Sequence, residues 1–213
     1  MPTNLIPAEE TRIEMRVENS RFIATVAPAF SVDEAKRFIQ RIKAEFSDAS
    51  HNVPAFVIGH GPSTIAHCTD DGEPSGTAGR PALAVLRGSG LGDVVVVVTR
   101  YFGGTKLGTG GLVRAYGAAV REVLFELTRA EKVPTQVVTV AIPYNLYEQT
   151  RQIVAAHAGA VLDELFAADV TLTIQFRATR FPEFQEALQE LTHGAVEATL
   201  VESNPDTIMP LEK

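Results

Sequence analysis

The chain has 213 residues, of which 45% are hydrophobic and 21% are charged, with a formal net charge of −7. This length accommodates two average domains, and the hydrophobic content excludes a disordered polypeptide. A single cysteine, Cys68, excludes an internal disulfide framework and fits a reducing compartment. The longest strongly apolar run, Val94–Val98, is far shorter than the roughly 20 residues of a membrane helix, and no signal peptide is visible. We expect a soluble, cytoplasmic protein with no membrane partner.

The negative charge is confined to the second half of the chain. Residues 1–133 carry 15 basic and 15 acidic side chains, whereas residues 134–213 carry four basic and eleven acidic ones. Within the first half, Gly76–Arg121 contains six basic residues and the single acid Asp93. A locally basic segment in an acidic protein favours an anionic partner.

The first half predicts an alternation of strands and helices. In chain order we expect a strand at Arg21–Phe30, a helix opened by the capping box Ser31–Glu34, strands at Val53–Ile58 and Thr64–Cys68, a short helix at Thr77–Leu86, a strand at Asp93–Thr99 and a long helix from Thr109. The unbroken valines of the Asp93–Thr99 strand predict burial on both faces of a sheet. On the long helix, Arg114 and Arg121 are seven residues apart and share a solvent-facing side.

The glycine content of the chain changes near Pro134, where the helical pattern ends. Eleven of the 16 glycines lie between Gly76 and Gly117, so we place a boundary that gives domains 1–133 and 134–213. The second domain predicts, in chain order, a strand at Gln136–Ile142, a helix at Asn145–His157, a hairpin of Ala160–Phe166 and Val170–Phe176, a helix from Pro182 to Gly194 and a strand at Ala195–Val201. This βαββαβ order is that of the ferredoxin-like fold. The predicted class is therefore α+β with two domains.

The densest cluster of polar residues is the segment Asp70–Pro81, which reads DDGEPSGTAGRP. Its carboxylates Asp70, Asp71 and Glu73 offer the oxygen ligands that Mg²⁺ prefers. The alternative is a charged turn, because Asp and Gly are turn residues and proline fixes the backbone dihedral φ. No distant carboxylate stands out to complete a metal site, so we predict no cofactor and keep Mg²⁺ as the alternative.

A glycine-rich segment, Thr99–Gly111 (TRYFGGTKLGTGG), follows the valine strand and opens the long helix. Backbone N–H groups in that context can hold a phosphate, and an aromatic side chain such as Tyr101 or Phe102 can stack on a base. The segment is not a Walker A loop, because Lys106 is followed by leucine. The predicted phosphate- or nucleic-acid-binding residues are Arg80, Arg100, Tyr101, Gly103, Gly104, Lys106, Gly110, Gly111 and Arg114. The alternative is a loop whose glycines serve close packing, with a solvated lysine.

The histidines and the cysteine of the first half do not predict a zinc site. The spacing of His51, His60, His67 and Cys68 matches no common structural zinc pattern, and the last two would face opposite sides of a strand. Cys68 is expected to act as a small buried hydrophobe. No catalytic set is predicted, so we do not expect an enzyme.

Long sequence blocks of the first half resemble the signature blocks of the Impact/YigZ family. They are Ser20–Ala24 (SRFIA), Asp70–Gly79 (DDGEPSGTAG), Thr99–Gly111 (TRYFGGTKLGTGG) and Leu112–Gly117 (LVRAYG), in a match that spans residues 20 to about 125. The second half is similar to the C-terminal domain of bacterial YigZ-type proteins. The resemblance implies a ribosomal-protein-like α/β first domain and a ferredoxin-like second domain. One departure is Val53, where the family often has cysteine.

The resemblance implies a link to translation without implying a catalytic residue. Eukaryotic Impact proteins regulate translation through an additional domain that these 213 residues do not contain, so we do not carry that activity over. Our leading hypothesis is a translation-associated protein that binds RNA or the ribosome through the glycine-rich loop, with Arg100, Lys106 and Arg114 contacting phosphate. The alternatives are a small phosphate-ligand enzyme that uses Mg²⁺, and a module that binds a protein partner through the acidic second domain.

Overall fold

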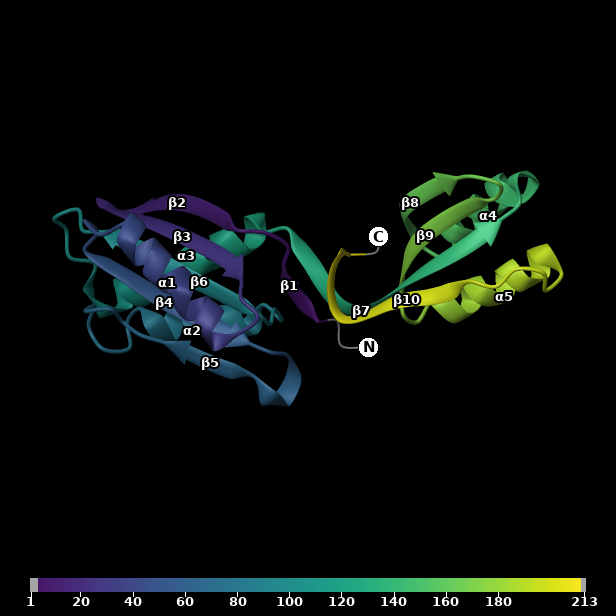
Figure 1. Ribbon diagram of the computed structural model, residues 1–213. Coiled ribbons are helices and arrows are strands. Elements are labelled where there is room, and N and C mark those ends of the chain that lie inside the picture. Colours follow the sequence, from purple (N-terminus) through teal and green to yellow (C-terminus); the bar gives the residue numbers. More distant parts are fainter. Residues whose placement is uncertain (1–3, 212–213) are drawn as a thin grey trace. The chain divides into compact units, whose positions relative to one another are not determined.

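A computed structural model of the chain describes residues 4–211 (Figure 1). The described residues form two compact units: unit 1 contains the residues up to Glu131 together with Pro210 and Leu211, and unit 2 contains Lys132–Met209. Each unit has its own hydrophobic core. The predicted α+β class with two parts is confirmed. None of the helices in the described residues is long and apolar enough to cross a membrane.

Unit 1 is built on a five-stranded antiparallel sheet with the strand order β2-β3-β6-β4-β5. The strands are β2 (Thr11–Val17), β3 (Ser20–Pro28), β4 (His51–Ile58), β5 (Ile65–Cys68) and β6 (Val94–Tyr101). A short 3₁₀ helix, Gly61–Ser63, connects β4 to β5. The central strand β6 pairs with β3 on one side and with β4 on the other, so both of its edges are hydrogen-bonded.

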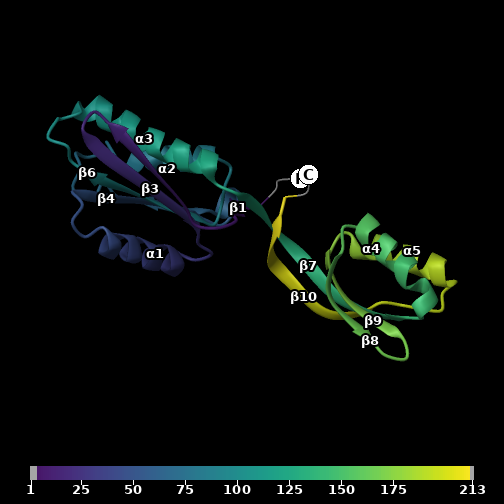
Figure 2. The same ribbon diagram turned by 90° about the horizontal axis from the view of Figure 1, so that it is seen from above.

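Helices cover both faces of this sheet. In Figure 2, α1 (Val32–Glu45) lies on one side, and α2 (Gly79–Gly88) and α3 (Gly108–Glu126) lie on the other. Val95 and Val97 of β6 belong to the core cluster under α1, and the alternate valines belong to the cluster under α2 and α3. The valine run is fully buried, which confirms the expectation from its unbroken apolar character.

The start of α1 follows its capping box. Ser31 Oγ accepts a hydrogen bond from the N–H of Glu34 at 3.1 Å, and the Glu34 carboxylate accepts one from the N–H of Phe30 at 2.7 Å. Side chains at helical spacing, Ala35, Ile39 and Ile42, are buried against the sheet. A local signal in the sequence thus fixes both where this helix begins and which face it buries.

Unit 2 has the βαββαβ order. Its elements are β7 (Arg129–Ile142, which begins in unit 1), a 3₁₀ turn at Tyr144–Leu146, α4 (Tyr147–Ala156), β8 (Ala160–Phe166), β9 (Val170–Arg177), α5 (Phe181–Thr192) and β10 (Thr199–Pro210). The strands run in the order β10-β7-β9-β8, with the first and last strands of the motif adjacent, as in a ferredoxin-like sheet. Along β9, side chains alternate between buried and half-buried, as predicted.

Two strand predictions need correction, and two further strands were not predicted. β1 (Leu5–Pro7) and β2 have no counterpart among the expected elements, and β7 begins at Arg129 rather than Gln136. The last strand runs over Thr199–Pro210 instead of Ala195–Val201. In the predicted segment, Val196 and Ala198 pack on the core of unit 2 from an irregular connection, so apolar alternation there reports burial without strand pairing.

Candidate phosphate and nucleic-acid site

The acidic motif, Asp70–Pro81, leads from β5 into α2, and its three carboxylates bond to different partners. Asp70 bonds to the start of α2, Asp71 bonds to α1 and β4, and Glu73 bonds to β6 and α3. Within residues 4–211, no group of three His, Cys, Asp or Glu side chains is arranged to hold a metal ion. The magnesium alternative therefore lacks a ligand set: the carboxylates are adjacent in sequence but diverge in space.

Asp70 caps α2 from several residues upstream. Its carboxylate accepts hydrogen bonds from the N–H groups of Gly76, Ala78 and Gly79 at 2.8, 3.1 and 2.8 Å. Partial burial acts to raise the pKa of Asp70, but the three N–H donors outweigh it and hold the pKa below its ordinary value. The N-terminus of α2 is thus already occupied by an anion from the protein itself.

Asp71 fixes the same turn to the opposite face of the sheet. One carboxylate oxygen accepts from Lys43 Nζ at 2.5 Å, and the other accepts from the N–H of Asn52 at 2.6 Å. The backbone carbonyl of Asp71 lies 2.8 Å from Nδ1 of His51. These contacts anchor the residue that precedes Gly72 and Glu73, and so set where the Glu73 side chain enters the interior.

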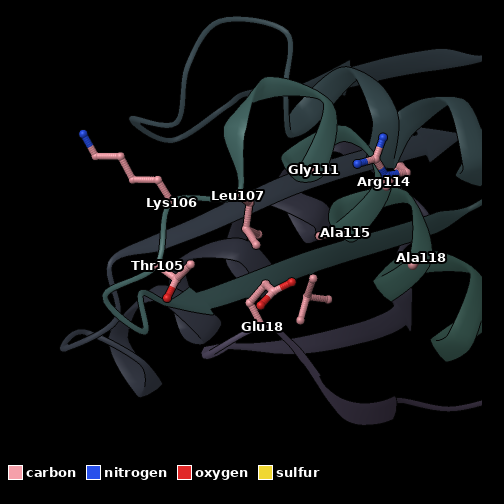
Figure 3. A pocket seen from close by; sticks show the side chains of 9 residues that line it. Glu18, Thr105, Lys106, Leu107, Gly111, Arg114, Ala115 and Ala118 are labelled. Carbon is pink, nitrogen blue, oxygen red and sulfur yellow. The ribbon is translucent and has the colours of Figure 1, made fainter.

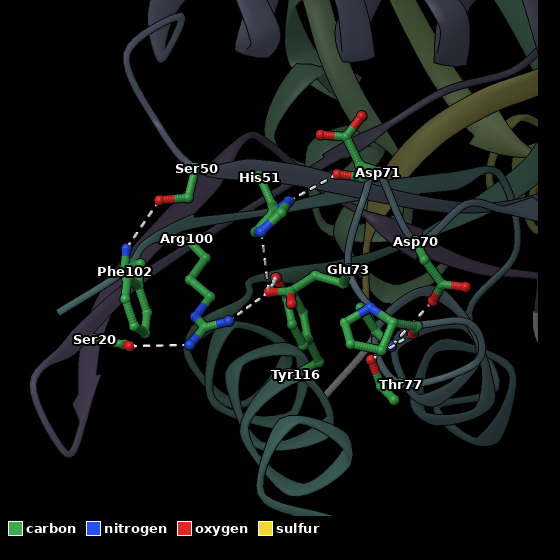
Figure 4. Close-up of polar contacts among 12 residues, drawn as sticks. Ser20, Ser50, His51, Asp70, Asp71, Glu73, Thr77, Arg100, Phe102 and Tyr116 are labelled. Carbon is green, nitrogen blue, oxygen red and sulfur yellow. Dashed lines mark hydrogen bonds and ion pairs between the residues drawn. The ribbon is translucent and has the colours of Figure 1, made fainter. Parts of the chain in front are cut away.

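Glu73 joins the acidic motif to the glycine-rich segment. Its Oε1 accepts hydrogen bonds from Nη1 of Arg100 at 2.7 Å and from the Tyr116 hydroxyl at 2.8 Å (Figure 4). His51 Nε2 lies 3.8 Å from the same oxygen. Both side chains of the ion pair are buried, Arg100 at 5% exposure and Glu73 at 3%. Burial and the Glu73 charge raise the pKa of Tyr116, which keeps its hydroxyl protonated as a donor.

Arg100 is held from several sides. Its Nη2 donates to Ser20 Oγ at 3.2 Å, and its guanidinium lies 5.5 Å from the ring centroids of both Phe22 and Phe102. Its Nε–H has no hydrogen-bond partner among the described residues. The sequence predicts a surface arginine that contacts phosphate, whereas in this structure Arg100 is the buried counter-ion of Glu73.

The two aromatic residues at the end of β6 differ in how far their side chains are free to contact a ligand. The Tyr101 hydroxyl donates to Asp48 at 2.7 Å, and the Tyr101 ring lies 5.1 Å from the guanidinium of Arg21. The hydrogen bond to Asp48 raises the pKa of Tyr101. Phe102 is 48% exposed. Phe102 therefore offers ring surface to a ligand, whereas Tyr101 is already engaged.

The glycines of the loop fall into two groups: those that packing or backbone conformation requires, and those whose N–H groups can bind a ligand. A Cβ at Gly103 would lie 1.8 Å from the backbone oxygen of Asn19, so only glycine fits there. Gly104 has a φ of +87°, which favours glycine. Gly110 lies in the first turn of α3, where N–H groups have no intrahelical acceptor, while the N–H of Gly111 is positioned to bond within the helix. Close packing explains Gly103, and Gly110 remains available to an anion.

The start of α3 is electrostatically open. Its N-cap residue, Leu107, makes no side-chain cap, and its first turn contains no acid. By contrast, α1 is capped by Ser31, α2 by Asp70, and α4 and α5 carry Glu148 and Glu183 in their first turns. Among the five α-helices of residues 4–211, α3 alone has neither a cap nor an acid to balance the positive end of its dipole.

Two cavities open beside this helix start. The Glu73 cavity has a volume of about 340 Å³ and is lined by residues that include Glu73, Arg100, Phe102, Lys106, Gly108 and Leu112. The Glu18 cavity has a volume of about 450 Å³ and is lined by residues that include Glu18, Thr105, Lys106, Gly111 and Arg114. Lys106 borders both cavities, and Figure 3 shows its side chain extending away from the Glu18 cavity. The N-terminus of α3 thus separates two concave surfaces.

The other predicted basic residues lie on the surface. Arg114 is exposed on α3, with its guanidinium close to Gly110, and Arg121 lies over Gly117 in the same way two turns later. Arg80 is exposed in the first turn of α2, near enough to Asp70 to lower the pKa of that carboxyl group. Lys106 is exposed in the loop. Four of the five predicted cationic or aromatic side chains thus remain accessible or partly accessible, and Arg100 does not.

Two of the histidines and the cysteine lie on neighbouring strands of the sheet of unit 1. His67 and Cys68 are neighbours on β5, and His51 begins β4. Cys68 is half-buried rather than fully buried, and burial together with the charge of Asp70 raises its pKa. A raised thiol pKa disfavours the reactive thiolate.

Sequence reasoning missed the polar roles of Tyr116 and Ser20. Tyr116 lies on the buried, apolar face of α3, and a buried tyrosine hydroxyl also requires a polar partner. That requirement points to a buried acceptor nearby, which here is Glu73. Ser20, although part of a recognised sequence block, carries no signal that would have linked it to Arg100.

Comparison with known proteins assigns both units. Residues 18–124 match the Impact N-terminal domain, and residues 140–195 match a domain of unknown function, DUF1949. The fold and the paired motifs thus define a two-domain protein with an Impact-type first unit. The chain is 36% identical to the IMPACT family member YigZ of Escherichia coli (strain K12), over 95% of this chain and all of that protein. It belongs to the IMPACT family.

Two further matches agree with this assignment. The IMPACT family member YvyE of Bacillus subtilis (strain 168) is 37% identical over 85% of this chain and 83% of that protein. A crystal structure of a hypothetical protein superposes with a TM-score of 0.62 at 36% identity, covering 95% of this chain and 98% of that one. The predicted resemblance to the Impact/YigZ family is confirmed.

Proposed function

We propose that the protein acts in translation by binding RNA, free or within the ribosome, at the surface around the start of α3. The observation that carries this proposal is the open N-terminus of α3, flanked by the exposed cations Lys106 and Arg114. An uncapped helix start favours a bound anion, and the two side chains add positive charge on both sides of it. Membership of the IMPACT family supports the link to translation.

RNA is favoured over an isolated small anion because the charged surface is extended. Arg114 and Arg121 lie on one side of α3 two turns apart, which is about 10 Å along a helix. Phe102 adds an exposed ring of the kind on which single-stranded bases stack. Glu18, in the wall of the neighbouring cavity, would repel a phosphate there, so the backbone is expected to follow α3 instead.

The test is RNA binding as a function of salt, with a charge-matched control. Labelled single- and double-stranded RNA would be titrated with the wild type, with Lys106→Ala/Arg114→Ala, and with Lys36→Ala/Arg37→Ala, which removes the same charge from α1 on the opposite face of the sheet. For single strands, each lost phosphate contact reduces the slope of log K against log salt by about 0.7, so the first variant should lose roughly 1.4. Arg100 is left intact because its removal would strand a buried charge.

Each result of the RNA titration has a different interpretation. Weaker binding and a smaller slope in the α3 variant, with the α1 variant unchanged, support the proposal. Equal losses in both variants would mean that net charge rather than this surface attracts RNA. Absence of binding at low salt would exclude the proposal.

A second candidate function is binding of a protein partner through unit 2, which holds the excess of acidic residues. The edge strand β8 exposes Leu162, Leu165 and Phe166, and Tyr144 lies beside it with its ring 6.4 Å from that of Phe166. Exposed apolar side chains on a sheet edge are characteristic of protein contacts. Loss of a captured partner in Leu162→Ser/Leu165→Ser, with RNA binding retained, would support this candidate.

A further inference from the structure

The Glu73 cavity combines features that the RNA-binding surface alone does not require. Its volume of about 340 Å³ falls within the range of small-molecule pockets, which is roughly 300–1,000 Å³. Its walls include Pro74, Phe102, Leu107 and Leu112, which are apolar, and its charged side chains are Glu73, Arg100 and Lys106. An extended phosphate backbone needs neither a concave apolar space nor a buried carboxylate.

The inner end of the cavity holds a carboxylate with one unused oxygen. Both hydrogen bonds to Glu73, from Arg100 and Tyr116, go to Oε1. Oε2 accepts no hydrogen bond from residues 4–211 and is not among their fully buried unpaired polar atoms, so it is accessible to a small ligand. An ionised carboxylate oxygen that receives no donor from the protein can accept a hydrogen bond from a ligand N–H at this point.

The carboxylate is also rigidly placed. Arg100, which fixes it, is itself confined between Phe22 and Phe102 and bonded to Ser20. Because the ion pair exists before any ligand arrives, the acceptor is preorganised and little ordering accompanies binding. Arg100 also lines the cavity, and its Nε–H is a buried polar group without a hydrogen-bond partner among the described residues.

The outer end of the cavity favours an anion. Gly108 and Thr109, in the first turn of α3, line it, and their N–H groups precede the first intrahelical bonds. Lys106 stands at the same edge. A ligand that fills the cavity would therefore present N–H donors to Glu73, a flat apolar body to Phe102, and a negative group to α3.

We propose that the Glu73 cavity binds one nucleotide, with its base against Phe102 and donating to Glu73 Oε2, and its phosphate at the N-terminus of α3 beside Lys106. The nucleotide is either a free nucleoside monophosphate or the terminal residue of an RNA strand; the second source rests on the RNA-binding function proposed above. An amino-bearing base is preferred, because the exocyclic NH₂ of adenine, guanine or cytosine donates freely. The only base N–H of uracil lies between two carbonyl oxygens that a carboxylate repels.

Calorimetric titration of the full chain with AMP, GMP, CMP and UMP, and with the matching nucleosides, tests the pocket directly. We expect the three amino-bearing nucleotides to bind more tightly than UMP, and each nucleotide to bind more tightly than its nucleoside. Equal affinity for nucleotides and nucleosides would overturn the phosphate position. Absence of binding by all four nucleotides, together with no preference for RNA ends, would overturn the pocket.

Two variants separate the pocket from general charge effects and from loss of folding. Thr109→Glu places a carboxylate in the first turn of α3, where it stabilises the helix but repels a phosphate, and Thr109→Gln is its neutral control. We expect the glutamate variant to melt no lower than the control and to lose nucleotide binding. Phe102→Ala should weaken binding by about 5- to 150-fold, the loss of one stacked base. Retained binding in both variants would overturn the proposal.

Linear and circular single-stranded RNA of one sequence distinguish the two sources and the two proposals. Preference for the linear form, lost in Phe102→Ala, assigns the pocket to an RNA end. Mononucleotide binding without that preference assigns it to a free nucleotide. Salt-dependent RNA binding that is indifferent to ends, to mononucleotides and to Phe102 would overturn the pocket while preserving the proposed function. Mononucleotide binding without any RNA binding would do the reverse.

Discussion

Removal of the Glu73 carboxylate should destabilise unit 1 strongly and leave unit 2 unaffected. In Glu73→Ala, Arg100 would remain 5% exposed with no counter-ion, and the Tyr116 hydroxyl would lose its acceptor. Breaking a buried ion pair in this way costs about 3–5 kcal/mol. That is a large fraction of the roughly 5–15 kcal/mol by which a domain is stable.

The companion variants divide this loss into its parts. Tyr116→Phe removes one hydrogen bond to a charged acceptor, worth about 1.5–3 kcal/mol, and leaves no charge unpaired. The double variant of Glu73→Ala and Tyr116→Phe should cost less than the sum of the single variants, since both remove the same bond. Glu73→Leu combined with Arg100→Met replaces the pair by apolar side chains and should be more stable than Glu73→Ala alone.

Native-state hydrogen exchange measured peptide by peptide is the suitable assay, because it reports each unit separately. Amide protection should fall in β6 and α3 and stay unchanged in β9, whose core is formed by unit 2 alone. Far-UV circular dichroism in urea gives the corresponding free energy of unfolding. A loss below about 1 kcal/mol for Glu73→Ala, or an equal loss of protection in β9, would refute the reasoning.

Three further substitutions test the local geometry through melting temperatures. Asp70→Asn should destabilise by about 1 kcal/mol at neutral pH. Because the folded-state pKa of Asp70 is lowered, its contribution is complete above the unfolded pKa of about 4 and is lost as pH falls through the folded value, so the gap should close in acid. Gly103→Ala should destabilise by about 1–3 kcal/mol, since its Cβ meets the Asn19 carbonyl at 1.8 Å. Gly110→Ala should stabilise by about 1 kcal/mol, because its Cβ meets only the Arg114 side chain, at 3.5 Å.

Each of these expectations has its own contrary result. An Asp70→Asn gap that is constant from neutral pH to below pH 3 would mean that the carboxylate charge does not stabilise α2. A wild-type melting temperature for Gly103→Ala would contradict the close approach of the loop to the β2–β3 turn. Destabilisation by Gly110→Ala would mean that the start of α3 needs glycine for its conformation rather than for access.

Local signals in the sequence predicted much of unit 1 because they act over a few residues. The Ser31 capping box and the valines of β6 each determine their element without help from distant parts of the chain. β2 carried the alternation Ile13, Met15, Val17, which is a usable strand signal that was not used. β10 carried none: its sequence includes Pro205 and several polar residues, so its pairing with β7 depends on the tertiary context.

The position of Arg100 could have been predicted from the parity of its strand. Val94, Val96 and Val98 face the core under α2 and α3, and Arg100 follows at the same two-residue interval. An arginine on an inward-facing position requires a buried anion, and the nearest sequence block offers three carboxylates. Sequence alone could not select Glu73 among them, because that choice depends on the turn in which Asp71 is held by Lys43 and Asn52.

The difference between α2 and α3 shows why a glycine-rich helix start is insufficient to predict an anion site. Both helices follow glycine-rich segments on the same face of one sheet, and neither N-cap side chain forms a cap. At α2 the anion is Asp70, supplied from the same chain through three N–H bonds, so no ligand is needed. At α3 no carboxylate from residues 4–211 caps the first turn, and Lys106 adds to the positive charge. We therefore propose the anion site at α3 and not at α2, because at α2 the fold brings a carboxylate of the chain back to the helix start.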